Sequence, residues 1–543
     1  MKTALFAIAM GISCVSCVEN HEKMQEGKYE ATWESLAQYD QAPDWFRDAK
    51  FGIWAHWGPQ CLPEQGDWYA RLMYNEGSRQ YKWHCENYGH PSEVGFKDLI
   101  PRWKGEKWNP DSLVSLFKSA GAKYFFAMGN HHDNFDLWNS KYQSWNSVNM
   151  GPKRDIIGGW AKAARDNGLR FGVSIHSAHV WTWMETAQRA DKNGEKKGIP
   201  YDGKQTKEDG KGKWWEGYDP QELYAQNHPL SEESADNINR IHSQWAWENG
   251  ASVPSEEYCQ NFFDRTVDMI NKYAPDMVYY DDTSMPLWPV SDAGLRTVAH
   301  LYNKSMNEHQ GKNEAVVFAK ILTEEQKNCL VWDVEKGVPD RMQEKPWQTC
   351  TCLGNWHYDR HLYETNEYKS AKTVVHMLVD VISKNGNLLL SVPLRGNGSI
   401  DEKETKILEG ISEWIAVNGE AVFGTRPWKI FGEGPASEEA NPLKGQGFNE
   451  GKRKPFTDKD MRFVVKGDDL MYVHVMGWPE DGKVLVKSLA QGKNVKGKIE
   501  RVELLGYDGE LAFEQTTDGM SVELPEIHPN EISLALKVHI DNN

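Results

Sequence analysis

The chain has 543 residues, of which 62 are basic and 79 acidic, so its formal net charge is −17. This balance argues against a protein whose main role is to bind nucleic acid or an anionic membrane. The hydrophobic fraction of 39% and the aromatic fraction of 12% supply a large core and argue against disorder as the main state. The 24 tryptophans either fill that core or, in part, form flat walls of a binding site.

The first 17 residues have the pattern of a secretory signal, with one Lys, a short apolar run and small residues before Cys17. Ser16 and Cys17 resemble a bacterial lipoprotein cleavage site, which predicts a lipid anchor at Cys17; secretion without a lipid is the alternative. We therefore expect an exported protein, in the periplasm or on the outer membrane of a Gram-negative bacterium. The polar residues 18–38 are predicted to be a tether.

Six cysteines remain beyond this signal, and their spacing is irregular with no CxxC motif, which gives little support to a zinc site. An exported chain could pair some of them. The large core favours a mostly reduced, buried set instead. The six are Cys61, Cys85, Cys259, Cys329, Cys350 and Cys352.

Residues 39–424 alternate short apolar runs with amphipathic stretches, such as KYFFAM from Lys123 and DMVYYD from Asp276, with helical patterns at 110–120 and 157–167. This alternation predicts an α/β fold, a (β/α)8-like barrel catalytic domain. The charged, Gly- and Lys-rich residues 184–235 are predicted to form a long exposed insertion after a barrel strand.

The sequence pattern changes beyond Gly424. Residues 425–543 contain short segments in which apolar and polar residues alternate, separated by turn signals. Alternation with a period of two over short segments is typical of antiparallel strands with one buried face. We expect a C-terminal antiparallel β-sandwich domain.

Chemistry-bearing residues gather in four clusters, each placed where a barrel strand would end. In a barrel, such clusters lie at one end and face one pocket. The carboxylate that ends DMVYYD is a candidate nucleophile, and paired carboxylates are what glycoside cleavage requires. The alternative is that the acids are loop caps. The clusters are residues 50–58 with 66–73, 129–140, 278–286, and 331–350 with 355–360.

Two adjacent histidines, His131 and His132, can donate to sugar hydroxyls or bind a metal. Neighbouring residues at a strand end point to opposite sides, which disfavours both binding one ion. We therefore predict no metal and no cofactor. Flat walls for a sugar ring would come from aromatic residues in the clusters, namely Trp57, Trp68, Tyr279 and Trp356.

Long ordered strings resemble glycoside hydrolase family 29, the retaining α-L-fucosidases. They cover nearly all of the chain beyond the signal. The strings include KFGIWAHWG, GAKYFFAMGNHHDNFDLWNS, LVDVISKNGNLLLSVPLRGNGSI and, in the C-terminal domain, MYVHVMGWPEDGKVLVKSLA. The resemblance implies removal of terminal α-L-fucosyl residues from glycans by double displacement through a covalent glycosyl-enzyme.

The resemblance also implies the catalytic pair. Asp281 falls on the family's nucleophile, and Asp282, where glycine is usual, is supporting or incidental. Glu335 falls on the acid/base, whereas Gln348 replaces a second glutamate; an amide cannot transfer that proton but can hydrogen-bond a hydroxyl. We expect Asp281 ionised, Glu335 protonated by partial burial, and the two about 5–5.5 Å apart.

Substrate-binding residues follow from the same resemblance and from the clusters. His56, His131 and His132 are expected to hold ring hydroxyls, and Asp67 with Trp68 corresponds to the family's Glu-Trp pair. The remaining candidates for the pocket are Trp57, His176, Tyr279, Gln348, Trp356 and Tyr358.

One departure from the family pattern opens an alternative. Ser174, Ile175 and His176 stand where the family usually has Tyr-Tyr-Ser, so the wall beside the sugar is smaller or more polar. Such a wall would admit a hydroxymethyl group, which predicts an exo-α-L-galactosidase on the same scaffold. Gln348 motivates a further alternative, a non-catalytic sugar-binding lipoprotein. A metal-dependent hydrolase has the least support.

Overall fold

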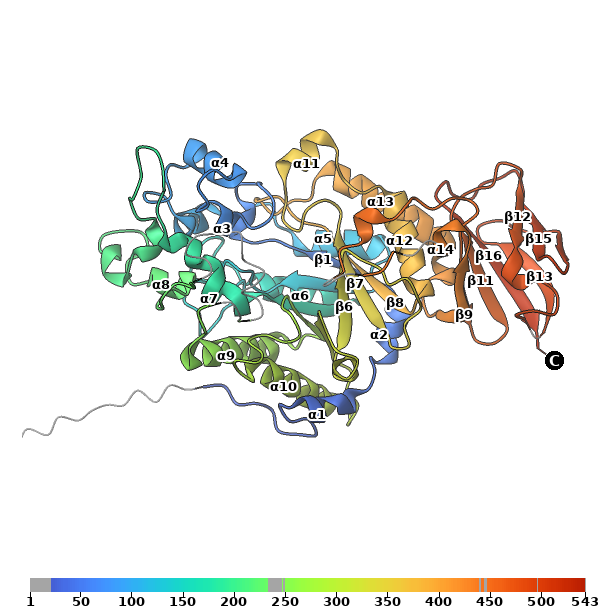
Figure 1. Cartoon of the computed structure of the whole chain (residues 1–543), viewed down its shortest axis with the longest axis horizontal. Coiled ribbons are helices and arrows are strands. Elements are labelled where there is room, and N and C mark those ends of the chain that lie inside the picture. Colours follow the sequence, from blue (N-terminus) through green and yellow to red (C-terminus); the bar gives the residue numbers. More distant parts are fainter. Residues whose placement is uncertain are drawn as a thin grey trace, which may run out of the picture.

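The computed structural model describes residues 21–232, 247, 250–438, 441–443, 447–495 and 497–542. The predicted signal, Cys17 and residues 18–20 lie outside the described residues. Figure 1 shows a barrel in the middle of an elongated molecule and a sheet domain at the C-terminal end. Within the described part, no helix has both the length and the apolar character needed to cross a membrane.

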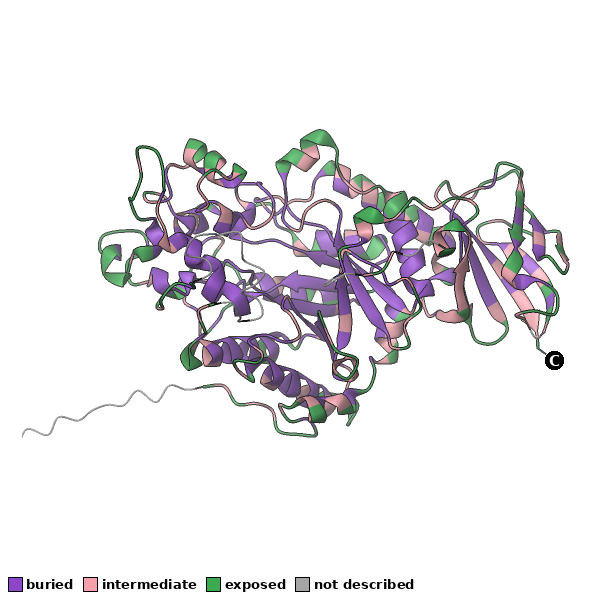
Figure 2. Ribbon diagram, in the orientation of Figure 1, coloured by how far each residue is buried: buried purple, intermediate pink, exposed green. Residues whose placement is uncertain are grey.

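Eight parallel strands close into a barrel in chain order, which confirms the predicted fold class. Their residues are almost all buried (Figure 2). Side chains fill the barrel inside the strands, and helices cover the strands outside. The strands are β1 (Phe51–Ala55), β2 (Tyr124–Met128), β3 (Arg170–Ile175), β4 (Met277–Tyr280), β5 (Val316–Ala319), β6 (Val331–Glu335), β7 (Trp347–Cys352) and β8 (Gly386–Ser391).

Longer helices separate many of these strands, and their ends follow local sequence signals. Asn109 and Asp155 cap the two helices expected from periodicity by accepting bonds from backbone N–H groups. The longer helices are α4 (Arg79–Asn87), α5 (Pro110–Ser119), α6 (Ile156–Asp166), α9 (Glu256–Tyr273), α10 (Ala293–Glu308), α12 (Ala371–Ser383) and α13 (Glu402–Asn418). The shorter ones are α1 (Trp33–Leu36), α2 (Asp44–Ala49), α3 (Tyr69–Leu72), α7 (Val180–Trp183), α8 (Pro220–Tyr224), α11 (Arg360–Thr365) and α14 (Pro435–Glu438).

The N-terminal segment is attached to the barrel from residue 21 onward, so the predicted tether over 18–38 is wrong for its described part. Tyr29 and Leu36 are buried in the core. The side chain of Asn303 on α10 donates to the carbonyl of Tyr29 at 2.8 Å and accepts from its N–H at 2.9 Å. A polar composition concealed these two apolar anchors.

The insertion is not the fully exposed loop that its composition predicted. Asp202 is buried, and its carboxylate pairs with Lys97 at 3.0 Å and accepts from the hydroxyls of Tyr74 and Tyr224 at 2.6 Å each. Trp215 is buried as well. These contacts hold the described part of residues 184–235 against the segment that follows β1.

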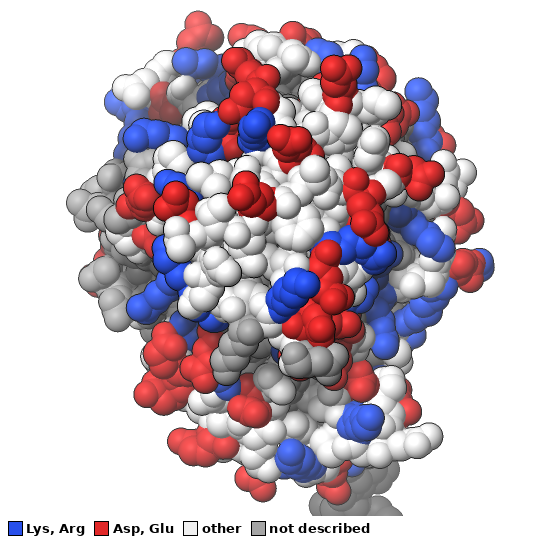
Figure 3. Space-filling model, turned by 90° about the vertical axis from the view of Figure 1, so that its right-hand side faces the viewer, with Lys and Arg blue, Asp and Glu red and all other residues white. Residues whose placement is uncertain are grey.

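The C-terminal domain consists of two antiparallel sheets around a core of their own, which confirms the predicted sandwich. On this end of the molecule acidic and basic side chains are interspersed, without a field of one sign (Figure 3). The strands are β9 (Arg426–Glu433), β10 (Met461–Lys466), β11 (Leu470–Val475), β12 (Lys483–Val486), β13 (Lys498–Leu504), β14 (Phe513–Gln515), β15 (Met520–Glu523) and β16 (Leu534–Asp541).

The cysteines match the expected reduced set. All six that follow the predicted signal are free thiols, and each is buried except Cys85, which is partly exposed. Burial in the core also raises the pKa of several of these thiols, to about 12 for Cys61 and Cys329.

Candidate active site

A cavity of about 280 Å³ opens at the carboxyl ends of the barrel strands. Parallel strands that close in chain order bring their ends together there, although the residues are far apart in sequence. The lining residues are Trp54, His56, Asp67, Trp68, His131, His132, His176, Tyr279, Asp281, Lys320, Glu335, Lys336, Cys350, Trp356 and Phe448.

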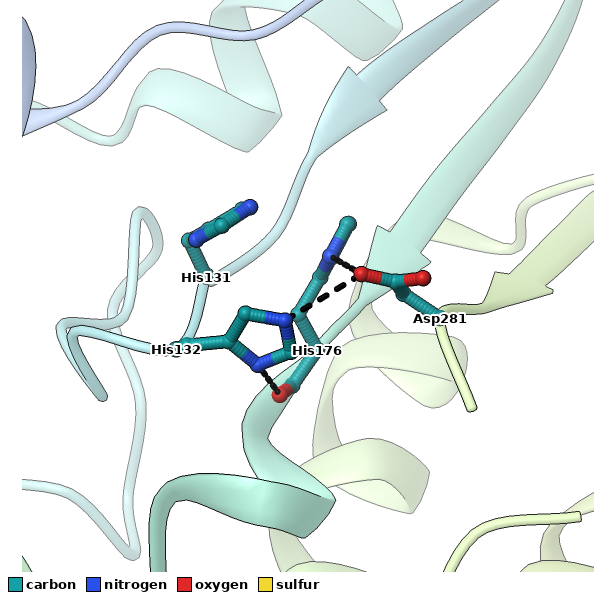
Figure 4. A group of neighbouring side chains, drawn as sticks. All are labelled: His131, His132, His176 and Asp281. Atoms are coloured by element: carbon teal, nitrogen blue, oxygen red, sulfur yellow. Dashed lines mark hydrogen bonds and ion pairs between the residues drawn. The ribbon is translucent and has the colours of Figure 1, made fainter. Parts of the chain in front are cut away.

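Asp281 follows β4 directly and is held from three sides. One oxygen, Oδ2, lies 3.0 Å from Nδ1 of His176 and 3.2 Å from Nε2 of His132 (Figure 4). The other oxygen, Oδ1, accepts from Nζ of Lys320 at 2.6 Å. Burial alone would raise the pKa of Asp281, but the charge of Lys320 and the two histidine bonds hold that pKa well below its usual value.

Lys320 links the two carboxylates of the pocket. It follows β5, and its ammonium group contacts both Asp281 and Glu335, the last residue of β6. Although burial opposes its charge, these two carboxylates hold the pKa of Lys320 well above its usual value. Because one nitrogen contacts both carboxylates, the contacting oxygens lie at most about 5 Å apart, which is no farther than the paired carboxylates of retaining glycosidases.

The histidines are oriented by contacts behind the pocket. Nε2 of His176 lies 3.0 Å from the hydroxyl of Ser174, and the backbone N–H of His176 donates to Asn130 at 3.1 Å. Nδ1 of His132 donates to the carbonyl of His176 at 2.8 Å. Burial lowers the pKa of His176 to about 4 and that of His131 well below its usual value, so both rings are neutral at pH 7.

Aromatic rings build one wall of the pocket. The ring centroid of Trp54 lies 4.2 Å from that of His56 and 4.7 Å from that of Tyr279. Trp356 lies 5.2 Å from His56. His56 is fixed from behind, because its Nδ1 lies 2.9 Å from the hydroxyl of Ser391 at the end of β8. Flat apolar faces beside buried polar nitrogens are what a sugar ring requires.

The family model described as alpha-L-fucosidase matches residues 16–420, and the model described as alpha-L-fucosidase C-terminal domain matches residues 454–539. The chain belongs to the α-L-fucosidase family. The resemblance seen in the sequence to glycoside hydrolase family 29 is thereby confirmed, and the chain is a glycoside hydrolase of this family.

Relatives and solved structures from this family agree with that placement. The tissue alpha-L-fucosidases of Rattus norvegicus and Bos taurus are 25% and 26% identical, over 92% and 94% of this chain and 89% and 91% of their own lengths. The crystal structure of Thermotoga maritima alpha-fucosidase in complex with fucose has 24% identity and a TM-score of 0.67, covering 94% of this chain and all of the other. It shows the same fold.

Most residues predicted for the pocket lie in it, but three do not. Gln348 is buried inside the barrel, where its amide donates to Asp333 and accepts from Tyr124, both at 2.9 Å, so it is not free to bind a hydroxyl. Trp57 packs between other tryptophans. Tyr358 lies away from the cavity, and its hydroxyl donates to the carboxylate of Asp401 at 3.0 Å. These three assignments are corrected.

The prediction that His131 and His132 point to opposite sides is also wrong. They follow the end of β2 by three and four residues, where the strand alternation no longer applies, and both line the cavity. Ligand atoms of His131, His132, His176 and Asp281 lie within 4.8 Å of one another. These residue types suit a metal ion as well as sugar hydroxyls. Asp282 instead turns away and pairs with His179 at 2.8 Å.

Several residues of the pocket were not predicted from the sequence. The most important is Lys320, whose charge is the only one in the described pocket that contacts both carboxylates. Its signal was present, since Lys320 ends an apolar run as Asp281 does. Trp54 lies within β1 and lines the cavity, but it was not predicted to be a pocket residue. Phe448 had no such signal, because it comes from beyond the barrel domain.

Proposed function

We propose that the protein is a retaining exo-α-L-fucosidase that removes terminal α-L-fucosyl residues from glycans, with Asp281 as the nucleophile and Glu335 as the acid/base. The observation that carries this proposal is the pair of carboxylates at the ends of β4 and β6, both within reach of one Lys320 nitrogen. The small cavity among histidines and aromatic rings suits a single terminal sugar. The choice of sugar rests on the relatives, which are alpha-L-fucosidases.

In the first step, an oxygen of Asp281 attacks the anomeric carbon while Glu335, which takes up a proton from solvent once the ammonium group of Lys320 has left it, gives that proton to the departing glycosidic oxygen. The products are a glycosyl ester on Asp281 and the free leaving group. In the second step, Glu335 takes a proton from a water molecule, whose oxygen displaces Asp281 and releases the sugar. The anomeric carbon must lie between the carboxylates, so entry of the sugar has to move the Lys320 ammonium group aside.

The test removes the negative charge of Asp281, the proposed nucleophile. We expect Asp281→Asn to lower hydrolysis of an aryl α-L-fucoside by at least about a thousandfold, because the amide is a poor nucleophile, while fucose still binds. Stopped assays measure turnover and calorimetry measures binding, with thermal unfolding as the check on folding. Retention of a tenth or more of the activity would contradict the assignment.

A second candidate, exo-α-L-galactosidase, is favoured by the polar wall beside the nucleophile. His176 lines the cavity, and the small Ser174 lies buried behind it rather than filling the pocket as a larger side chain would. The test is to measure kcat/KM for aryl α-L-fucoside and for aryl α-L-galactoside. A higher value for the galactoside overturns the fucosidase proposal in favour of the alternative.

Two further alternatives are decided in the same assays. A non-catalytic sugar-binding lipoprotein would bind one of these sugars but turn over neither aryl glycoside. A metal-dependent hydrolase using the group around His131 would lose activity in chelator and regain it with added zinc. The proposal predicts unchanged activity in chelator.

We also propose that the chain is exported through its N-terminal signal and anchored by a lipid at Cys17. The support is the sequence pattern before Cys17. Mass analysis of the mature N-terminus made in a Gram-negative host tests it. The expected species begins at lipidated Cys17, and an unlipidated mature end contradicts the anchor.

A further inference from the structure

A short segment of the chain returns from the C-terminal domain to the mouth of the pocket. It comes after β9 and α14, and its residues 447–450 lie along the end of β6. Phe448 donates its backbone N–H to the carbonyl of Glu335, and Glu450 donates to that of Lys336, both at 3.0 Å. Gly447 forms a parallel bridge with Glu335.

Buried side-chain bonds fix this segment in place. Asn449 is 2% exposed, and its amide accepts from the N–H of Val338 at 2.9 Å and donates to the carbonyl of Val338 at 3.0 Å. Glu450 accepts from Thr351 and pairs with Lys369, both at 2.7 Å. These bonds hold the segment in a fixed position at the edge of the site.

The close approach requires glycine at one position. Gly447 has φ 127°, and a Cβ there would lie 2.7 Å from Cγ1 of Val334 and 2.8 Å from the carbonyl oxygen of Glu335. The next residue, Phe448, has φ 38°, which is uncommon for a bulky side chain. Strain of this kind is often found where a side chain is held for a function.

Phe448 is half exposed although it lines the cavity. Its exposed fraction is 50%, whereas His132 and His176 at the bottom of the same cavity are 1% and 2% exposed. Its ring therefore lies at the mouth, and its backbone is bonded to Glu335, the proposed acid. The acid stands beside the leaving group in a retaining glycosidase, so Phe448 lies on the leaving-group side.

We propose that Phe448 is a specificity-determining residue, whose ring stacks on the sugar or other ring that leaves with the glycosidic oxygen. This inference rests on the proposed function and deepens it, by placing the binding site for the leaving group on a residue of the C-terminal segment. The apolar face of a pyranose is the chemistry that an exposed phenyl ring recognises. Trp356, which also lines the cavity, lies under the ammonium group of Lys336 at 5.1 Å and extends this rim.

The experiment varies the leaving group. The probes are α-L-fucosyl fluoride, whose leaving group has no ring, p-nitrophenyl α-L-fucoside, and the fucosyl disaccharide that the unaltered protein cleaves fastest among the (1→2), (1→3), (1→4) and (1→6) linkages. We expect Phe448→Ala to leave kcat/KM for the fluoride within about twofold and to lower it for the ring-bearing probes about five- to tenfold, mainly through KM.

Two controls make the result specific. Phe448→Trp keeps a flat ring and should retain activity on the ring-bearing probes, and Ile527→Ala removes another exposed apolar side chain from the C-terminal domain without effect. An equal loss on all probes, or no loss on the ring-bearing ones, overturns the proposal. Failure of the unaltered protein to cleave any of the probes overturns the proposed function and this inference with it.

Discussion

Asp281, the proposed nucleophile, shows how the surroundings of one carboxylate keep it ionised. Its carboxylate is largely buried, with 15% of the side chain exposed, a setting that alone would raise its pKa, yet an ammonium group and two imidazoles keep the pKa well below the usual value. A carboxyl whose pKa is depressed stays ionised as the pH falls, so the proposed nucleophile should remain competent in mildly acidic solution. Lys320 makes the largest favourable contribution to this shift.

Replacing Lys320 tests this account at the level of one charge. In Lys320→Met the charge is lost, so the pKa of Asp281 rises, and the acidic limb of the pH profile of kcat/KM should move to higher pH by about one unit or more. Lys320→Arg keeps the charge and should leave the limb close to its original position. An unchanged limb in Lys320→Met would show that this ammonium group does not control the nucleophile.

Residue types at strand ends could be predicted from the sequence, but their height along the barrel could not. Asp281 was predicted because it ends an apolar run, and Glu335 because it falls on the acid/base of the family pattern. Gln348 lies in a string that also resembles the family pattern. It nevertheless pairs in register with Asp333 inside the barrel, below the pocket. Depth in the barrel depends on the stagger between neighbouring strands, which sequence patterns do not reveal.

At the scale of elements, the insertion and the N-terminal segment were misjudged for one physical reason. Each has a polar composition, and a few buried residues decide its position. In the insertion, Asp202 is 1% exposed and Lys97 is 2% exposed, so their ion pair lies inside the protein. A single buried charge with satisfied partners outweighs many solvated ones in fixing where a segment lies.

Breaking this pair should release the insertion. We expect Asp202→Asn to lower the free energy of unfolding by about 3 kcal/mol, because Lys97 loses one of two carboxylate partners in a buried setting. Urea unfolding measures the change, and limited proteolysis within residues 184–232 should accelerate. As a matched control, Lys196→Gln removes an exposed partner of Glu93 and should change neither readout. Equal behaviour of the two variants would contradict this role for Asp202.

At the scale of the whole molecule, the two domains are joined by buried charges. Asp380 on α12 pairs with Arg462 on β10 at 2.6 Å, and both side chains are at most 1% exposed. Lys384 and Arg453 also contact Asp380, at 3.0 and 2.5 Å. The succession of domains could be predicted from long strings in the sequence. The contribution of the C-terminal segment to the pocket could not, because it depends on how the domains pack.

Buried histidines in both domains make the stability depend on pH. Burial lowers the pKa values of His300, His376 and His474 to about 4, below their value in the unfolded chain. Between these values the unfolded chain binds more protons, so stability present at neutral pH is lost as the pH falls from about 6.5 to about 4. Urea unfolding should show a loss of at least about 3 kcal/mol between pH 7 and pH 4.5. Constant stability over that range would contradict this account.

The central claim, a covalent sugar ester on Asp281, is tested most directly by trapping it. The unaltered protein is incubated with 2-fluoro-fucosyl fluoride, whose fluorine slows breakdown of the ester, and the digested protein is mapped by mass spectrometry. We predict one labelled peptide, with the sugar on Asp281 and no label in Asp281→Asn. A label on another residue, or turnover of fucosides without any adduct, would contradict the account.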